Sequence, residues 1–126
     1  MKNVLITGSS GLIGSEAVNF FLKKKFKVFG IDNDLRSKLF GKKHSTKKFV
    51  YSQKKNKNFK FFSINLVNYK TLENLFKKFK FDLILHTAGQ PSHDWSAKDP
   101  VFDFRINALA TVNLLQLTKL YSPKGV

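Results

Sequence analysis

Three equally spaced glycines near the start of the chain are the residues best suited to chemistry. Gly8, Gly11 and Gly14 lie between an apolar run at residues 4–6 and an amphipathic stretch from residue 13. In a strand–turn–helix unit, such glycines permit the turn, let the backbone approach a pyrophosphate, and let helix and strand pack closely. The helix start adds unpaired N–H groups and partial positive charge. Residues 7–14 therefore predict a dinucleotide phosphate site, the alternative being a turn without a ligand.

An acidic residue follows at the distance that such a site needs. Asp32 ends a second apolar run, residues 27–31, and lies 18 positions beyond Gly14. An acid about 20 residues after the glycines accepts hydrogen bonds from the adenosine ribose hydroxyls. The same carboxylate would repel a 2′-phosphate, so the pattern favours NAD over NADP. The alternative is an ordinary turn aspartate.

A polar cluster follows the fourth apolar run, residues 82–87. Ala88 and Gly89 are small enough to leave room for a cofactor. The polar residues Gln90, Ser92, His93 and Asp94 offer hydrogen-bonding groups of the kind that a sugar needs. His86 itself is more typical of a satisfied core histidine. The histidines and Asp94 lack a recognised ligand spacing, so we expect no metal site.

Four apolar runs alternate with helical patterns, and this order predicts the elements that position these residues. We expect strands at residues 4–6, 27–31, 59–66 and 82–87, with a helix N-cap at Asn68. After an irregular stretch, a last helix should begin at Asp99 and run to about Tyr121. Right-handed βαβ units then give a Rossmann-like three-layer α/β sandwich with a parallel sheet of order 3-2-1-4. A fifth strand would begin at Val126, where the sequence stops.

Each helical pattern includes apolar residues expected to face the core. These are Ile13, Ala17, Val18, Phe20, Phe21 and Leu22 in the first helix, Leu72, Leu75, Phe76 and Phe79 in the middle helix, and Leu109, Val112, Leu115 and Leu117 in the last.

Composition sets the class of protein. With 126 residues, the chain is at most one domain, the N-terminal part of a dinucleotide-binding Rossmann domain. It has no cysteine, no signal-peptide pattern and no apolar run near the roughly 20 residues of a membrane span, so a cytoplasmic location is expected. The net charge of +15 suggests a polyanionic partner, but only Arg36 and Arg105 of the 23 basic residues are arginine. A solvated lysine surface is favoured over nucleic-acid binding.

The basic charge is concentrated between residues 42 and 60. This segment holds eight lysines and no acidic residue, so we expect a solvated loop insertion that could include a short helix. A basic loop beside a nucleotide site could also attract a diphosphate substrate.

Several motifs together resemble a known family. The runs GLIGSEAVNFF, GIDNDLR, HTAGQPSHDW, DPxxDFxxNA and TxNLL look like those of the CDP-paratose 2-epimerases, also called CDP-tyvelose epimerases. These are extended short-chain dehydrogenase/reductase enzymes. The resemblance implies a tightly held NAD⁺ that oxidises C2 of a CDP-linked dideoxyhexose and returns hydride to the opposite face, a CDP-hexose substrate, and a homo-oligomeric full-length protein.

The resemblance also implies roles for individual residues. Substrate-binding positions are Gln90, Ser92 and His93; cofactor-binding positions are Gly8, Ser10, Gly11, Leu12, Ile13, Gly14, Asp32, Asn33, Arg36, Asn65, Leu66, Ala88, Gly89 and Asn107. Three positions depart from the family pattern: Asn65 replaces an aspartate beside the adenine amine, Gly89 replaces an alanine, and Ala110 replaces a glycine.

The catalytic pair of the superfamily is not found in its usual context. Its tyrosine and lysine, in a YxxxK pattern with a nearby Ser or Thr, follow the fifth strand, so we expect them beyond Val126. The string from Tyr51 to Lys55 matches, but it lies before the third strand and is taken as coincidental. We therefore expect these 126 residues alone to be inactive. Alternatives are a nucleotide-sugar 4-epimerase, dehydratase or reductase, or a non-catalytic dinucleotide- or polyanion-binding module.

Overall fold

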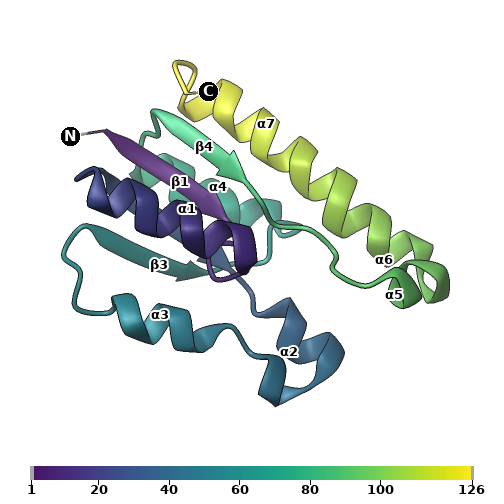
Figure 1. Ribbon diagram of the computed structural model, residues 1–126. Coiled ribbons are helices and arrows are strands. Elements are labelled where there is room, and N and C mark those ends of the chain that lie inside the picture. The colour runs from purple at the N-terminus through teal and green to yellow at the C-terminus, as the bar shows by residue number, and fades with distance from the viewer. Residues whose placement is uncertain (1, 126) are drawn as a thin grey trace.

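The computed structural model describes residues 2–125 as strands alternating with helices (Figure 1). The elements follow one another as β1 (Asn3–Thr7), α1 (Leu12–Lys23), β2 (Lys27–Asp32), α2 (Leu35–Phe40), the 3₁₀ turn η1 (Lys42–His44), α3 (Lys47–Gln53), β3 (Phe59–Ser63), α4 (Tyr69–Lys78), β4 (Leu83–His86), α5 (His93–Lys98), α6 (Pro100–Phe104), the π-helical turn η2 (Arg105–Leu109) and α7 (Ala110–Tyr121).

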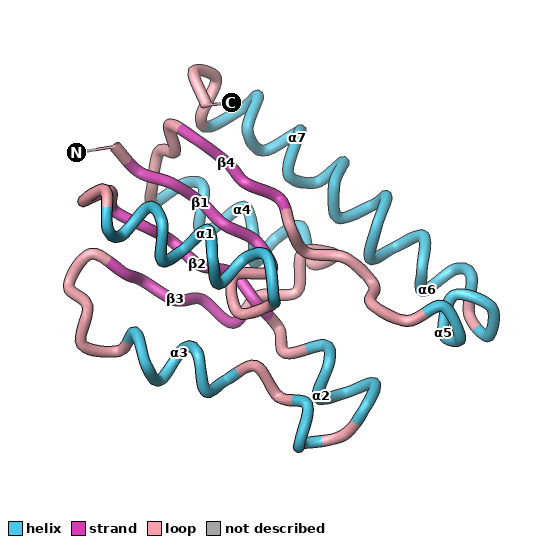
Figure 2. The backbone as a smooth tube through the Cα atoms, viewed as in Figure 1, coloured by secondary structure: helices cyan, strands magenta, loops and turns pink. Residues whose placement is uncertain are grey.

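The described strands form one parallel sheet in the order β3-β2-β1-β4 (Figure 2). In register, Thr7 stands opposite Ile31 on one side and His86 on the other, and Asp32 pairs with Ser63. The predicted α/β class and strand order are therefore confirmed. The fifth strand expected at Val126 lies outside the described residues.

Two apolar layers cover the two faces of the sheet. Val4, Ile6 and Val28 point to the face covered by α1 and α3, whereas Leu5 and Phe29 point to the face covered by α4 and α7. This alternation follows from the two-residue period of a strand. Because both faces are covered, β1 and β2 carry continuous apolar runs between their polar ends, as parallel strands usually do. The observed layers are those of the predicted three-layer sandwich.

Local end signals in the sequence locate two helix starts correctly. Asn68 Oδ1 accepts a hydrogen bond from the Thr71 N–H at 3.1 Å, and Asp99 Oδ1 accepts one from the Phe102 N–H at 2.9 Å. Both side chains satisfy an N–H that the helix leaves unpaired. The stretch before Asp99 is more regular than expected, because Ser92 caps the short helix α5 in the same way.

The basic segment predicted as a loop is largely helical and anchored at one residue. Asp34 Oδ2 accepts a hydrogen bond from Ser45 Oγ at 2.7 Å, and its Oδ1 accepts one from the Thr46 N–H at 2.9 Å. Burial alone would raise the pKa of Asp34, but these bonds and the charge of Lys47 lower it. Phe49 of α3 packs on the core beside Phe59. The segment was expected to be a loop that could include a short helix, and it contains the short helix α3, preceded by η1.

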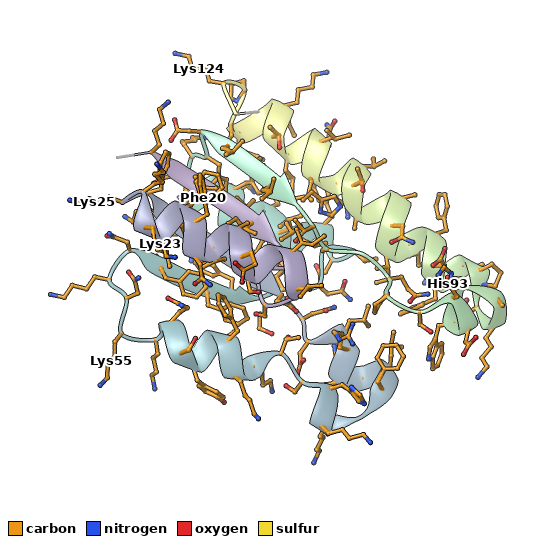
Figure 3. The ribbon with its side chains drawn as sticks, viewed as in Figure 1. Phe20, Lys23, Lys25, Lys55, His93 and Lys124 are labelled. Carbon is orange, nitrogen blue, oxygen red and sulfur yellow. The ribbon has the colours of Figure 1, made fainter. Side chains whose placement is uncertain are left out.

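Lysines lie on the outside of this arrangement. Figure 3 shows Lys23, Lys25 and Lys55 projecting from the ends of α1 and α3 that lie farthest from the carboxyl edge of the sheet. Lys23 occupies the last turn of α1, where a cation offsets the negative end of the helix dipole. Helix stability alone therefore gives a reason for a lysine at this position.

The last helix turns a different face to the core than predicted. Ala110, Leu114 and Leu117 are buried, whereas Val112 is 58% and Leu115 65% exposed. At 100° per residue, positions 112 and 115 lie about 150° around the helix from the centre of the buried stripe and so face outward. The prediction was thus right for Leu117 and wrong for Val112 and Leu115.

The first helix shows a similar division. Val18 is fully buried, and Ala17, Phe21 and Leu22 pack against it as expected. Phe20 and Ile13 are exposed instead, Ile13 by 69%. The third strand also ends at Ser63 rather than at Leu66, because residues 64–66 leave the sheet; Ile64 and Leu66 remain buried, whereas Asn65 is exposed. No helix within residues 2–125 is long and apolar enough to cross a membrane.

Candidate functional site

A cleft of about 280 Å³ opens at the carboxyl ends of the strands. It is bordered by the turn after β1, the segment after β2, the turn after β3 and the loop after β4. Open α/β sheets bind their ligands at this edge. The sequence-predicted residues that line the cleft are Gly8, Gly11, Leu12, Ile13, Gly14, Asp32, Asn33, Arg36, Asn65, Leu66, Ala88 and Gly89.

Glycine is required at two positions of the first turn. Gly8 has a φ of +64°, and a Cβ on it would lie 2.7 Å from the Ala88 nitrogen. A Cβ on Gly14 would lie 2.0 Å from the Gly8 carbonyl oxygen. Gly11 is different, since the same atom there would come no closer than 3.3 Å to Gly8. Gly8 and Gly14 therefore shape the turn, while Gly11 leaves the backbone open toward the cleft.

The first turn of α1 is well suited to an anion. Gly11 is its N-cap residue, so no side chain caps the free N–H groups, and the first turn holds no acidic residue. Unpaired N–H groups and the helix dipole attract negative charge at such an end. Leu12, 89% exposed, and Ile13 present apolar side chains to the same cleft. The turn thus fits a phosphate flanked by apolar parts of a ligand.

Asp32 is held rigidly at the rim of the cleft. Its Oδ2 accepts a hydrogen bond from the Ser10 N–H at 3.0 Å, and its Oδ1 accepts one from the Asp34 N–H at 2.8 Å. Each carboxylate oxygen keeps a lone pair for a ligand hydroxyl. Ser10 contributes only through its backbone here, because its Oγ is buried and makes no hydrogen bond; the residue also borders a second, adjoining cavity.

The turn after β3 forms another wall of the cleft. Asn65 Oδ1 accepts a hydrogen bond from the Val67 N–H at 3.1 Å, and its carbonyl oxygen accepts one from the Asn68 N–H at 2.9 Å. Asn65 therefore organises the turn itself. One lone pair of its amide oxygen remains for an amine donor from a ligand.

His86 is a structural residue whose hydrogen bonds define its tautomer. Thr111 Oγ1 donates its proton to the Asn107 carbonyl at 2.6 Å. It must therefore accept a hydrogen bond from the N–H of His86 Nε2, 3.1 Å away. His86 Nδ1 then accepts the proton of Thr7 Oγ1 at 2.6 Å. Burial lowers the pKa of His86, in agreement with a neutral ring. The sequence-based view of His86 as a satisfied core histidine is confirmed.

The polar loop after β4 makes its hydrogen bonds mainly within itself. Gln90 Nε2 donates to the Ser92 carbonyl at 2.7 Å, and the Ser92 N–H donates to Gln90 Oε1. Asn107 Oδ1 accepts from the Gln90 N–H at 3.0 Å, while its Nδ2 donates to Asp103 at 3.2 Å. Gln90, Ser92 and Asn107 do not line the cleft. Figure 3 shows His93 on α5, apart from the sheet.

Sequence reasoning missed several apolar residues of the cleft and its neighbour. Leu35, Ile64, Val67, Pro91, Ile106 and Ala110 line the cleft beside Ile31, Thr46 and Thr87. The second cavity shares Asp32, Asn33 and Thr46 with the cleft, and it is bordered by Tyr51 of α3. Tyr51 of the YxxxK-like string therefore lies on the Asp32 side of the cleft, in a cavity that Gly89 does not line. Among residues 2–125, no group of three or more His, Asp or Glu could hold a metal ion.

These features define a class: a Rossmann domain with a glycine turn, an open helix start and an acid at the carboxyl edge of a parallel sheet. The family model described as GDP-mannose 4,6 dehydratase matches residues 5–125. The chain belongs to this family, which lies in the extended short-chain dehydrogenase/reductase superfamily. The family assignment agrees with the predicted superfamily.

Curated relatives have similar sequences over nearly the whole chain. A UDP-glucuronate 4-epimerase of Thermodesulfobacterium geofontis is 31% identical over 98% of this chain and 38% of its own length. A UDP-glucose 4-epimerase of Cyamopsis tetragonoloba is 33% identical, and the match covers 34% of its length. A dTDP-D-glucose 4,6-dehydratase of Dictyostelium discoideum is also 33% identical, over 27% of its length. The chain thus spans about a third of these relatives.

Solved structures share the fold. Pal from Bacillus thuringiensis superposes with a TM-score of 0.82 at 28% identity, covering 94% of this chain and 36% of that one. The UDP-glucose 4-epimerase of Thermus thermophilus, solved as a complex with NAD, has a TM-score of 0.76 at 33% identity, covering 94% and 34%. The region that matches is in both cases about a third of a longer protein.

Proposed function

We propose that the cleft binds NAD and that residues 1–126 are the cofactor-binding part of a nucleotide-sugar epimerase. The observation that carries the proposal is the placement of three features around one cleft: the Gly8–Gly11–Gly14 turn, the uncapped start of α1 and the fixed carboxylate of Asp32. NAD in the related Thermus thermophilus structure supports the choice of cofactor.

The residues divide into groups along the proposed ligand. N–H groups at the start of α1 would hold the pyrophosphate, Asp32 the adenosine ribose, and Ala88 with Gly89 the nicotinamide side. The further assignments are Gly8, Ser10, Gly11, Leu12, Ile13 and Gly14 to the phosphates, Asn33 and Arg36 to the ribose side, Asn65 and Leu66 to adenine, and Asn107 to the loop beside the nicotinamide.

Bound NAD would supply a hydride acceptor for a sugar carbon, and the protein would bind and orient it. The neutral His86 has a supporting role. It accepts the Thr7 hydroxyl proton, so Thr7 Oγ1 keeps a lone pair for the Ala88 N–H at 3.3 Å. This fixes the start of the loop that would face the nicotinamide.

The substrate is proposed to be a CDP-hexose on the resemblance of the QPSHDW loop to CDP-paratose 2-epimerases. In this loop Gln90 and Ser92 form hydrogen bonds with each other. His93 of α5 is therefore the residue whose side chain is most available to a sugar. A second candidate is a 4-epimerase or dehydratase, because similar relatives carry the names UDP-glucose 4-epimerase and dTDP-D-glucose 4,6-dehydratase. Incubating the full protein with CDP-, UDP- and GDP-sugars and analysing the products by NMR distinguishes the two. A changed C2 centre in a CDP-sugar supports the first; a changed C4 centre in a UDP-sugar contradicts it.

We further propose that residues 1–126 give no turnover by themselves. The Tyr121 hydroxyl donates a hydrogen bond to Glu73 Oε1 at 2.8 Å, and Tyr51 borders the second cavity. Neither tyrosine is therefore placed as a proton-transfer group beside Gly89. The coding sequence beyond Val126 is the direct test. A continuing frame with a YxxxK pair after a fifth strand supports the enzyme, while a stop supports a non-catalytic binding module.

A further inference from the structure

A buried asparagine on the last helix holds the turn after β3. Asn113 is 7% exposed and lies on the core-facing stripe of α7, among Ala110, Leu114 and Leu117. Its Nδ2 donates to the Leu66 carbonyl at 2.9 Å and lies 3.4 Å from that of Val67. A polar amide in an apolar stripe is costly unless it is bonded, so the position has a reason beyond packing.

Hydrogen bonds within the turn after β3 also stabilise it. Asn65 accepts the Val67 and Asn68 N–H groups, which leaves the Leu66 and Val67 carbonyls pointing inward to α7. Loss of the Asn113 amide would leave the Leu66 carbonyl buried without a donor. The turn would then be free to move away from the cleft that it borders.

We propose that Asn113 is a positioning residue that sets the adenine end of the cleft. The inference rests on the proposed NAD site, in which Asn65 and Leu66 face the adenine. Through Thr111 and Asn107, the same helical segment also supports His86 and the loop after β4. One continuous helix thereby fixes both ends of the cleft, and Asn113 is its contact with the adenine side.

The test uses Asn113→Leu, which keeps the branched shape and the number of heavy atoms of the side chain and removes the amide, in the full protein. Thr118→Val is the matched control, because Thr118 lies on α7 and bonds only within it, to the Leu114 carbonyl at 2.7 Å. We expect Asn113→Leu to weaken NAD⁺ binding about tenfold and to speed amide exchange at Val67 and Asn68. Thr118→Val should change neither the NAD⁺ affinity nor the amide exchange at Val67 and Asn68.

A purely structural role for Asn113 would lower thermal stability without these two effects. Unchanged NAD⁺ affinity in a folded Asn113→Leu protein overturns the proposal, whether or not exchange in the turn changes. Asn113→Ser also removes the hydrogen bonds to the Leu66 and Val67 carbonyls but adds no apolar bulk, and we expect it to weaken NAD⁺ binding to the same extent. If Asn113→Leu does not fold, Asn113→Ser therefore provides the test. Wild-type protein that does not bind NAD⁺ would instead refute the proposed cofactor site.

Discussion

Replacing Gly14 with alanine tests how the glycine turn works. The new Cβ would lie 2.0 Å from the Gly8 carbonyl oxygen, where ordinary contacts begin near 3.4 Å, so the turn would have to retreat by more than an ångström. Overpacking of this kind costs about 3 kcal/mol when backbone atoms must move. The better helix propensity of alanine returns about 1 kcal/mol. The expected net loss is about 2 kcal/mol, or about 8 °C in Tm for a domain of this size.

Gly11→Ala is the matched control, because its Cβ would come no closer than 3.3 Å to Gly8. We expect its stability to stay within about 0.5 kcal/mol of wild type. NAD⁺ affinity should nevertheless fall at least tenfold, since the methyl group occupies the approach to the pyrophosphate. Thermal unfolding followed by circular dichroism, together with calorimetric NAD⁺ titration, measures both effects. A Tm for Gly14→Ala within 2 °C of wild type would refute the packing role of Gly14.

Three further predictions concern other parts of the molecule. Burial holds the pKa of His86 below its usual 6.5, so as the pH falls the imidazole is protonated in the unfolded chain before it is protonated in the folded one. The contribution of the neutral ring to the free energy of unfolding is therefore complete above pH 6.5 and decreases as the pH drops. In denaturant unfolding, His86→Asn should flatten this dependence of stability on pH. Tyr51→Phe should leave turnover of the full protein within twofold, and a thousandfold loss would show that the string at residues 51–55 is catalytic. Asn68→Ala should cost about 1 kcal/mol of stability by loss of the cap on α4, and an unchanged denaturation midpoint would contradict that cap.

The fold was predictable because its signals are local. Short apolar runs mark buried parallel strands, and the caps Asn68 and Asp99 mark helix starts. The handedness of βαβ units limits the possible strand orders, and the glycine turn favours the Rossmann order 3-2-1-4 among them. The face of α7 was not predictable in this way, since apolar side chains lie on both of its sides. Only the packing against α4 shows that Leu114 is buried and Leu115 is not.

The site shows the same division between local and distant contacts. Gly8, Gly14 and Asp32 were found because their spacing follows from the turn and strand that carry them. The structure of the basic segment depends on Asp34 meeting residues 11 and 12 positions away, and charge pattern alone does not show this. Asn113 was missed because its partner, Leu66, lies 47 positions earlier in the chain.

In the proposed function, this cleft binds NAD through the glycine turn and Asp32. Calorimetric titration of the full protein with NAD⁺ and with NADP⁺ tests it most directly, with Asp32→Ser as the comparison variant. We expect binding of one NAD⁺ per chain, at least tenfold weaker binding of NADP⁺, and loss of this preference in Asp32→Ser. Equal or tighter binding of NADP⁺ by the wild-type protein, or binding of neither dinucleotide, would contradict it.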